Sequence, residues 1–370
     1  MNIPRINEIT DIKGKRVLVR ADMNVTIGTD GIIDDHEAWR IKRALHTITY
    51  LRDQGAKVIV VTHLGRDGAS VQPIYRYLQK HITLGFVPQV TGPLVTEMVS
   101  AMGDGTILLL ENVRQDKREE SGDESLAVEF AKLADIYVND GFAVSHRNHT
   151  SVTGIPKLLP SYAGIQFSDE LDNLEKMLDP QHPLLVVLGG LKFDTKLPLI
   201  EKFLNIADYV FVGGALAHPI LVGRGHKVGK SAIDENADVS NLINRDDIII
   251  PEDYVLSNGH VHTDTIVDDH EKIVDIGPES LKLLETLVRE SATVFWNGPL
   301  GKSDNFEGGT EKFADIVARH DAFSVVGGGD TISVLSKKGI EGRFGFVSTA
   351  GGAMLEFLVH GTLPGVDALK

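Results

Sequence analysis

The sequence predicts an α/β protein of two domains, each with a mainly parallel sheet flanked by helices, joined by a hinge helix. Short apolar runs alternate with segments of helical periodicity along the whole chain, as expected for successive βα units. Several of these runs end in glycine or polar residues, which is typical of the carboxyl edge of a parallel, Rossmann-like sheet. A chain of 370 residues, 42% of them hydrophobic, is also long enough for two separate cores.

The first half of the chain contains four expected strands whose carboxyl ends carry polar residues. The strands are expected at residues 16–20, 57–61, 106–110 and 135–138, with a helix at residues 41–54. The polar side chains that would meet at one edge of this sheet are Asp22, Asn24, Arg40, His63, Arg66, Arg114, His146 and Arg147. A single arginine is more often a solvated surface residue, but repetition at one edge favours a binding site. Because guanidinium groups fit carboxylates and phosphates, we expect a small ligand that carries both.

A helix over residues 168–178, capped by Ser168 or Asp169, is expected to connect the two halves. We therefore assign residues 1–167 to the first domain, residues 168–180 to the connecting hinge helix and residues 181–357 to the second domain. The second domain is expected to have strands at residues 184–188, 209–212, 293–296 and 323–326, and a small extra sheet within residues 247–267.

Residues 323–333, FSVVGGGDTIS, predict a strand, a glycine turn and the start of a helix. The glycines let the backbone approach an anion, and the first amides of the helix point to the same place, so a phosphate is expected there. Asp330 would repel that phosphate unless a divalent cation lay between them, as Mg²⁺ does at nucleotide sites. The alternative is that Asp330 only caps the helix.

Lys192 and Lys196 stand four residues apart at the expected start of another helix. Two ammonium groups on one face there oppose the helix dipole and each other, by roughly a few tenths of a kcal/mol each, so an anion is expected to offset them. The alternative is a pair of solvated lysines. Further glycine turns favour a nucleotide lying across the sheet edge; they are Gly213–Gly214, Asn297–Gly301 and residues 348–352.

Composition and charge exclude several classes of function. A formal charge of −15 argues against a nucleic-acid or anionic-membrane partner, because both favour a basic surface. The absence of cysteine excludes disulfides, thiolate chemistry and cysteine-based zinc sites. The first residues have no apolar signal core and no apolar run approaches transmembrane length, so we expect a cytoplasmic protein.

An ordered set of motifs resembles the phosphoglycerate kinase family over essentially the whole chain. The motifs are Asp22-Met-Asn-Val, His63-Leu-Gly-Arg66, Glu111-Asn-Val-Arg114, Asn139-Asp140 with His146-Arg147, Gly189-Gly-Leu-Lys192, Trp296-Asn-Gly-Pro299, Gly327-Gly-Gly-Asp330-Thr331 and Ser348-Thr349. Any one of them could arise by chance, whereas the set in the family's order is highly specific.

The resemblance implies a hinge-bending kinase that moves a phosphoryl group between 1,3-bisphosphoglycerate and ADP, giving 3-phosphoglycerate and ATP, with Mg²⁺. It implies that the first domain binds the phosphoglycerate through Asp22, Asn24, Arg40, His63, Arg66, Arg114 and Arg147. It implies that the second domain binds the nucleotide through Lys196, Gly213, Asn297, Pro299, Gly328, Gly329, Asp330 and Thr331, with Asp330 as the magnesium ligand. Arg40, Lys192 and Gly351 would be the catalytic positions. Residues 358–370 would pack on the first domain, and we expect a monomer.

The chain also departs from the family pattern. Met23 and Thr26 replace the usual Phe and Pro, Leu191 replaces Ala, Ala350 replaces Gly, and His218-Pro219 stands near the family's Asn-Thr. The largest departure follows Gly301, where the family has Val-Phe-Glu, whose carboxylate holds the ribose, and this chain has a shortened segment with Lys302-Ser-Asp304. Asp304 or Glu307 is expected to take the ribose-binding role, and the sequence leaves both of them, and the base preference, open.

A dehydrogenase and a non-catalytic binding protein are the two alternative functions. A dehydrogenase would need G-x-G-x-x-G after an early strand, whereas the first strand runs into Ala21-Asp22-Met23-Asn24. A non-catalytic binding protein on the kinase scaffold is the second alternative. Arg40, Lys192 and Asp330 favour the enzyme, because keeping these charges together is costly without an anion and a metal.

Overall fold

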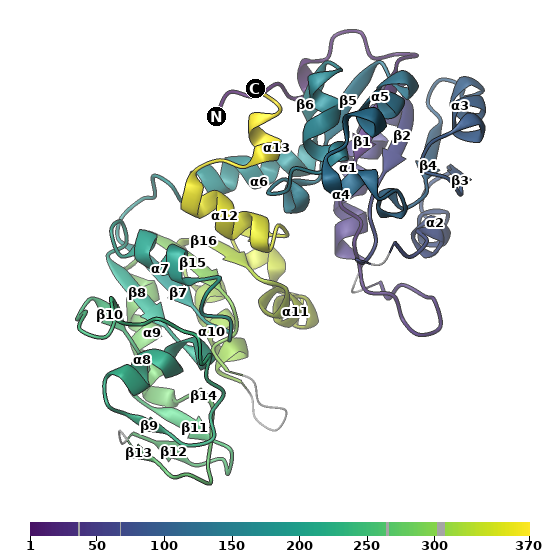
Figure 1. The fold of residues 1–370 in the computed structure, drawn as a ribbon. Coiled ribbons are helices and arrows are strands. Elements are labelled where there is room, and N and C mark those ends of the chain that lie inside the picture. Colours follow the sequence, from purple (N-terminus) through teal and green to yellow (C-terminus); the bar gives the residue numbers. More distant parts are fainter. Residues whose placement is uncertain (36–37, 67, 264–265, 302–307) are drawn as a thin grey trace. The chain divides into compact units, whose positions relative to one another are not determined.

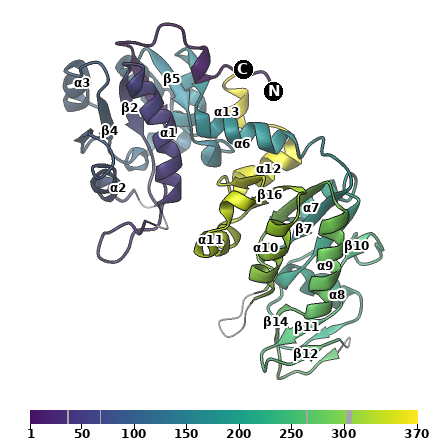
Figure 2. The same ribbon diagram turned by 180° about the vertical axis from the view of Figure 1, so that it is seen from behind.

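The computed structural model describes residues 1–370 except 36–37, 67, 264–265 and 302–307. It contains two compact units, Met1–Glu175 with His360–Lys370, and Lys176–Val359. Each unit is built on a parallel sheet of six strands with helices packed against it (Figures 1 and 2). The predicted α/β fold with two mainly parallel sheets is therefore confirmed, while the finer domain boundaries and a separate hinge segment at residues 168–180 stay predictions. Within the described ranges, no helix has both the length and the apolar character needed to span a bilayer.

The sheet of the first unit has the strand order β3-β4-β2-β1-β5-β6, and all of its pairings are parallel. Its strands are β1 (Arg16–Arg20), β2 (Lys57–Val61), β3 (Gly85–Val87), β4 (Ile107–Leu110), β5 (Ile136–Asn139) and β6 (Ser161–Ala163). The four strands predicted from the sequence are the central neighbours β4, β2, β1 and β5. The two edge strands of three residues each, β3 and β6, were not predicted, because such short runs carry little periodicity.

Burial explains why the central strands are continuous apolar runs. Val17, Leu18 and Val19 of β1 are fully buried, as expected for a parallel sheet covered on both faces. The helices of this unit are α1 (Trp39–Asp53), α2 (Gln72–Leu78), α3 (Pro93–Ser100), α4 (Arg118–Ser121), α5 (Glu124–Leu133), α6 (Ile165–Glu175) and α13 (Pro364–Asp367). The C-terminal helix α13 belongs to this unit, where the Gly365 N–H donates to the Ser145 carbonyl at 2.8 Å.

Helix α6 begins at Ile165, three residues before the cap predicted at Ser168 or Asp169. Its first amides are satisfied by side chains from elsewhere in the unit. The Ile165 N–H donates to Thr47 Oγ1 at 2.9 Å, and the Gln166 N–H donates to Asp140 Oδ1 at 3.0 Å. The helix start was misplaced because these capping groups are distant in sequence, and a local motif cannot reveal them.

The sheet of the second unit has the order β10-β8-β7-β15-β16-β17, again with parallel pairings throughout. Its strands are β7 (Leu184–Leu188), β8 (Tyr209–Val212), β10 (Ile248–Ile249), β15 (Thr293–Asn297), β16 (Phe323–Gly327) and β17 (Phe346–Ser348). The four predicted strands are again the central neighbours, and the edge strands β10 and β17 complete the sheet.

Smaller sheets lie beside the main sheet of this unit. One contains β11 (Tyr254–Leu256), β12 (Val261–His262) and β14 (Ile273–Ile276), and the other pairs β9 (Lys227–Val228) with β13 (Ile266–Val267). The small sheet expected within residues 247–267 is thus present in part, because Ile248–Ile249 pairs with β8 of the main sheet instead and β14 lies further along the chain.

Helices cover the second sheet in the same way, with α9 and α10 running along one face in Figure 2. The helices are α7 (Leu197–Phe203), α8 (His218–Gly223), α9 (Pro278–Glu290), α10 (Gly309–Arg319), α11 (Gly329–Lys338) and α12 (Gly352–His360). The core between sheet and helices includes Trp296, which packs edge-on against Phe313 with ring centroids 4.8 Å apart. Single helical turns of the 3₁₀ or π type occur at Ile6–Glu8, Val113–Gln115, Phe142–Val144, Thr150–Gly154, Ile155–Lys157, Gly214–Ala217 and Glu341–Arg343.

Candidate functional site

The loops that follow β1, β2 and β4 in the first unit are tied to one another by hydrogen bonds. The Met23 N–H donates to Thr62 Oγ1 at 3.1 Å, and the Gly65 N–H donates to Asn24 Oδ1 at 2.9 Å. Asn112 Nδ2 donates to the Leu64 carbonyl at 2.8 Å. These bonds hold the carboxyl edge of the sheet in one arrangement, which places polar side chains from different strands at fixed positions.

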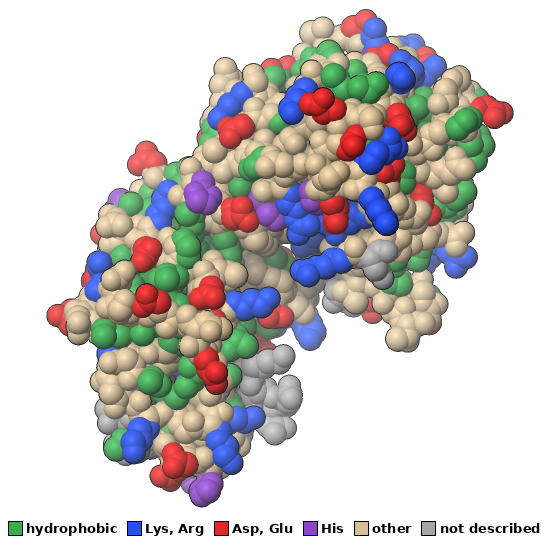
Figure 3. All heavy atoms as spheres, viewed as in Figure 1, with side chains coloured by type: hydrophobic (Ala, Val, Ile, Leu, Met, Phe, Trp, Pro, Cys, Tyr) green, Lys and Arg blue, Asp and Glu red, His purple; other side chains and the backbone are tan. Residues whose placement is uncertain are grey.

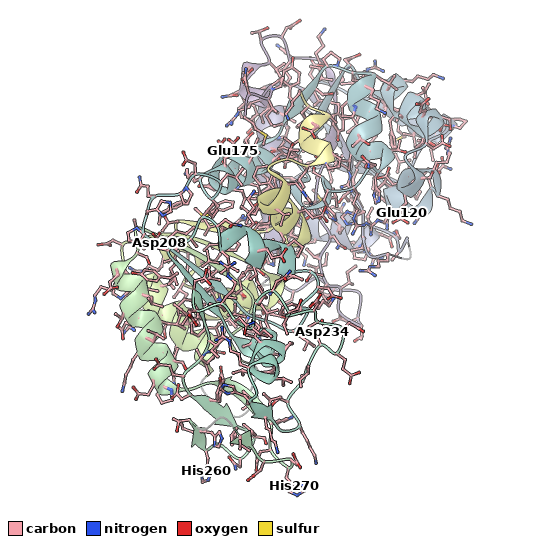
Figure 4. The ribbon with its side chains drawn as sticks, turned by 60° about the vertical axis from the view of Figure 1, so that its left-hand side comes forward. Glu120, Glu175, Asp208, Asp234, His260 and His270 are labelled. Carbon is pink, nitrogen blue, oxygen red and sulfur yellow. The ribbon has the colours of Figure 1, made fainter. Side chains whose placement is uncertain are left out.

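Two of the predicted arginines are held at this edge by specific contacts. Arg40, in the first turn of α1, donates from Nη1 to Asp22 Oδ2 at 2.8 Å, and its guanidinium lies 4.8 Å from the centre of the Trp39 ring. Arg114 donates to the Gly65 carbonyl and pairs with Glu120 at 3.3 Å. Glu120 is labelled in Figure 4, on the first unit.

His63 is buried at the same edge and has a defined tautomer. Arg20 Nη2 lies 3.2 Å from His63 Nδ1, and because arginine can only donate, Nδ1 accepts and the ring proton resides on Nε2. The pKa of His63 is far below its usual value, first because of burial and then because of the nearby positive charges of Arg20, Arg114, Arg40 and Arg147. His63 is therefore neutral near pH 7, and Nε2–H can donate to an anion without adding to the charge repulsion.

Arg20 was missed by the sequence reasoning, although it is fully buried. Besides His63, it contacts Ser151 Oγ at 2.8 Å and the Ala21 carbonyl at 2.5 Å. Ser151 in turn donates from Oγ to Glu119, which is itself fully buried. The signal was available in the strand Arg16–Arg20, where the last position of an apolar run carries a charge that must find partners inside the protein.

The remaining predicted residues of this edge divide into two groups. Arg147 joins the cluster: its charge is among those that lower the pKa of His63, and its Nε lies 3.2 Å from His146 Nε2. Burial, then Arg147 and Arg114, lower the pKa of the neighbouring His149 to about 4. Arg66, by contrast, is exposed on the loop after β2, and among the described residues its guanidinium makes no contact with the cluster.

The structure thus brings Arg40, His63, Arg114 and Arg147 together, with Asp22 and Asn24 beside them. Figure 3 shows Lys, Arg and His side chains gathering on the face of this unit. Burial and the Arg147 charge also lower the pKa of the Arg114 guanidinium. The neighbouring carboxylates therefore do not fully balance the positive charges at this edge. In a chain with a net charge of −15, such a group of neighbouring cations indicates a site for a small anion.

The glycine turn of the second unit has the predicted form. β16 ends at Gly327, and α11 begins at Gly329 after Gly328, whose φ of +102° is open only to glycine. Gly328 occupies the cap position, so Asp330 is not the cap and its carboxylate is exposed in the first turn of α11. The first amides of this helix and the carboxylate are therefore presented together at the sheet edge.

Lys196 lies at the centre of the glycine turns of this unit. Its ammonium group donates to the Gly189 carbonyl and lies 3.5 Å from the Asn297 carbonyl. A Cβ at Gly298 would clash with the Gly189 carbonyl oxygen and lie 2.5 Å from Lys196 Nζ, so glycine there makes room for both the carbonyl and the ammonium group. Burial lowers the pKa of Lys196 to about 8, an effect that the nearby Asp330 charge partly offsets.

The expectation that Lys192 and Lys196 share one helical face was wrong. Helix α7 begins only at Leu197, and Lys196 precedes it as the cap residue. Phe193 is buried, its N–H donates to Asp234 Oδ2 at 3.1 Å, and residues 194–196 form a turn before the helix. As a result, Lys196 points inward to the strand ends, whereas Lys192 is exposed on the loop.

A cavity of about 390 Å³ opens beside this glycine-rich edge. The predicted residues Pro299 and Asp330 line it. Asn297, the last residue of β15, and Gly213, which directly follows β8, do not line it but are close in sequence to the lining residues Pro299 and Gly214. The rest of its wall is formed by Gly190, Leu191, Gly214, Ala215, His218, Ala232, Pro251, Tyr254, Lys272, Ile273, Val274, Asp275, Ile276, Leu300 and Gly301. Apolar walls with a few polar groups, beside backbone amides and an ammonium group, suit a nucleotide.

Other predicted residues of this unit lie in or beyond the same edge. Thr331 Oγ1 is buried in the first turn of α11 and has no hydrogen-bond partner in the described part of the chain. Gly351, with a φ of +54°, directly precedes α12. Asp304 and Glu307, the two candidates for the ribose, fall outside the described residues. Within those residues, no group of three or more His, Cys, Asp or Glu side chains is arranged to hold a metal ion.

Comparison with known proteins gives a consistent result. Residues 6–360 match the family model described as phosphoglycerate kinase. Among curated relatives, the phosphoglycerate kinase of Pseudothermotoga lettingae is 38% identical over 97% of this chain and 96% of its own length, and that of Herpetosiphon aurantiacus is 38% identical over 96% of each. The solved structure of phosphoglycerate kinase from Coxiella burnetii, 32% identical, has a TM-score of 0.86 and covers 100% of this chain and 98% of its own. The crystal structure of phosphoglycerate kinase from Pyrococcus horikoshii OT3, 27% identical, has a TM-score of 0.87 and covers 99% and 98%.

Proposed function

The chain belongs to the phosphoglycerate kinase family, and we propose that its two units divide the substrates between them, phosphoglycerate on the first unit and the magnesium nucleotide on the second. The reaction is the reversible transfer of a phosphoryl group between 1,3-bisphosphoglycerate and ADP, which gives 3-phosphoglycerate and ATP in glycolysis. The observation that carries the assignment of substrates is the pair of contrasting edges: arginines around a neutral histidine on one sheet, and glycine turns around Lys196 on the other.

On the first unit, Arg40, His63, Arg114 and Arg147 bind the carboxylate and phosphate of the triose acid. Arg40 is oriented by Asp22, and Asn24 holds the neighbouring loop by accepting from the Gly65 N–H. Arg66 would contribute from the exposed loop, and binding would require its side chain to turn toward the ligand. Charge-assisted hydrogen bonds of this kind are worth roughly 1.5–3 kcal/mol each, so the loss of one arginine weakens binding strongly.

On the second unit, the nucleotide phosphates lie at the first turn of α11 near Gly328, Gly329 and Thr331, with Lys196 as their cation. The exposed carboxylate of Asp330 fits Mg²⁺, because magnesium prefers oxygen ligands and takes several of them from the phosphates themselves. When bound, the ion neutralises charge that develops on the phosphates. Asn297, Pro299 and Gly213 shape the strand ends around the nucleotide. Asp304 or Glu307 would hold the ribose.

Transfer requires little covalent chemistry from the protein, because placement and charge neutralisation do most of the work in phosphoryl transfer. Arg40 and Lys192 would stabilise the transferring group, with Gly351 beside it. The exposure of Lys192 agrees with a side chain that engages only the bound substrates. Because the two substrates bind to different units, we propose that the units close to bring them together and exclude water, acting as a monomer in the cytoplasm.

A turnover assay tests the enzyme against a non-catalytic binding protein. With ATP, Mg²⁺ and 3-phosphoglycerate, the wild type should turn over, and Lys192→Ala and Arg40→Ala should each lower kcat by orders of magnitude. The exposed residues Lys312 and Arg76 provide matched controls, whose alanine variants should keep wild-type rates. If the wild type turns over only at background but still binds both substrates in calorimetry, the enzyme hypothesis is rejected in favour of the non-catalytic binding protein.

A further inference from the structure

His218 is a buried histidine in the wall of the nucleotide cavity that the phosphate chemistry does not use. It is the first residue of α8 and follows the turn Gly214–Ala217 at the end of β8. Only 3% of it is exposed, yet it lines the cavity. It also stands at a position where the chain departs from the family pattern.

The tautomer of His218 is set by one hydrogen bond. Nδ1 lies 2.7 Å from the Ala232 carbonyl oxygen, which can only accept, so Nδ1 carries the hydrogen. Burial lowers the pKa of His218, and the ring is neutral near pH 7. Nε2 therefore carries a lone pair. It has no hydrogen-bond partner within the described ranges, and it is not fully enclosed by protein atoms. Because His218 lines the cavity, Nε2 opens on it.

The topology places His218 at the end of the cavity opposite the phosphates. β8 and β16 are separated by β7 and β15, so their ends lie roughly 14 Å apart at the usual strand spacing. Given the proposed function, on which this step rests, the phosphates occupy the β16 end beside Asp330. The base of the nucleotide then reaches the β8 end, where His218 stands.

The surroundings of His218 suit a flat heterocycle. The cavity has apolar walls at Leu191, Ala215, Pro251 and Ile273. The Tyr254 hydroxyl donates its hydrogen to the Pro251 carbonyl at 3.0 Å. Lys272 also lines the cavity, but it is exposed to solvent on a flexible stem and can only donate. His218 differs because burial and the Ala232 bond fix both its position and its hydrogen-bonding sense.

We propose that His218 reads the base edge of the nucleotide: Nε2 accepts a hydrogen bond from an exocyclic amino group, and the cavity therefore prefers a 6-aminopurine to a 6-oxopurine. A 6-oxopurine would turn a carbonyl oxygen toward this lone pair. Shifting the ring proton to Nε2 would relieve that repulsion, but it would leave the Ala232 carbonyl without its donor. A buried polar group left unpaired in this way weakens binding on the order of tenfold or more.

The test compares nucleotides that differ at this one position. Isothermal calorimetry with Mg-ATP and Mg-ITP measures binding without relying on turnover, and the rate with 3-phosphoglycerate is recorded separately. The wild type should bind ATP about tenfold or more tightly than ITP. His218→Phe keeps a ring of similar size without a lone pair, and His218→Gln can either accept or donate, so both should bring the ratio close to one. Lys272→Met is the matched control and should retain the wild-type ratio.

The outcomes separate this inference from the proposed function. Equal affinity of the wild type for ATP and ITP, or an unchanged preference in a folded His218→Gln, overturns the base-reading role even if the protein is an active kinase. A clear preference for ATP that His218→Gln abolishes supports the role even if turnover is at background, in which case the proposed function fails alone. A preference lost in Lys272→Met and kept in His218→Gln would assign base reading to the lysine and overturn the inference.

Discussion

Replacing Lys196 by methionine should abolish the pH dependence of nucleotide binding between pH 7 and pH 9.5. In the free protein, burial lowers the pKa of Lys196 to about 8, from the usual 10.5. The ammonium form is the one that attracts a phosphate, and a bound phosphate favours that form again by opposite charge. Binding above pH 8 must therefore be accompanied by proton uptake, and affinity must fall as pH rises.

The size of the pH effect on ADP affinity follows from how far burial lowers the pKa of Lys196. If the bound phosphate restores the usual pKa, the coupling between proton and nucleotide is about 3 kcal/mol at most. Between pH 7 and pH 9 the Kd for ADP should then weaken roughly tenfold, and close to one proton should be taken up per nucleotide near pH 9. Lys196→Met removes the titrating group, so its affinity should be lower at pH 7 and nearly constant with pH.

The assay is isothermal calorimetry of ADP binding at several pH values, each in two buffers of different ionisation enthalpy, which yields the protons taken up. The matched control is Lys202→Met, because Lys202 Nζ donates to the Val359 carbonyl at 3.0 Å, outside the nucleotide cavity. A wild-type Kd that is constant from pH 7 to pH 9.5, or a Lys196→Met variant that keeps the wild-type slope, would refute the reasoning.

Three further predictions concern groups on either sheet edge. Arg20→Met should raise KM for 3-phosphoglycerate and lower the free energy of unfolding by about 3–5 kcal/mol, because it leaves His63 without its donor and the buried Glu119 without the nearby positive charge. The affinity for ADP, measured by calorimetry, should stay at the wild-type value. Gly298→Ala should weaken ADP binding on the order of tenfold without changing 3-phosphoglycerate affinity, because at a φ of +94° a Cβ would clash with the Gly189 carbonyl oxygen and crowd Lys196 Nζ, which donates to that oxygen; unchanged ADP affinity would contradict this. Asp140 has its pKa raised to about 8 by complete burial, so the folded chain keeps a proton that the unfolded chain loses near 3.8, and stability falls as pH rises between these values. Asp140→Asn has no titrating group there and lacks that loss. The melting temperature of the variant minus that of the wild type should therefore be larger at pH 8 than at pH 5.

The central strands of both sheets were predictable because their apolar runs are long, bounded and followed by polar or glycine residues. The same reasoning found the turn at Gly327–Gly329 and most of the arginine cluster, since parallel strands bring their carboxyl ends to one edge. It missed what depends on contacts between distant segments. The start of α6 is set by Thr47 and Asp140, and His63 is fixed by Arg20 from inside the sheet.

The lysine pair shows the limit of spacing arguments. A four-residue interval predicts a shared face only if the segment is helical. Residues 191–196 are not helical, and Phe193 among them is buried with its N–H bonded to Asp234. Asp234, labelled in Figure 4, lies 41 positions after Phe193 in the chain, so no local sequence signal indicates this bond. The sequence nevertheless singled out Lys196, because it stands shortly after a strand and two glycines, and in the structure two strand-end carbonyls lie beside its ammonium group. Its role in nucleotide binding stays a proposal.

The most direct test of the account is a crystal structure of the protein with 3-phosphoglycerate and Mg-ADP. The triose acid should lie at Arg40, His63, Arg114 and Arg147 of the first unit, and the ADP phosphates at the first turn of α11 with Lys196 and an Asp330-bound magnesium ion. Phosphoglycerate bound away from the arginine cluster, or a nucleotide whose phosphates avoid α11, would contradict it.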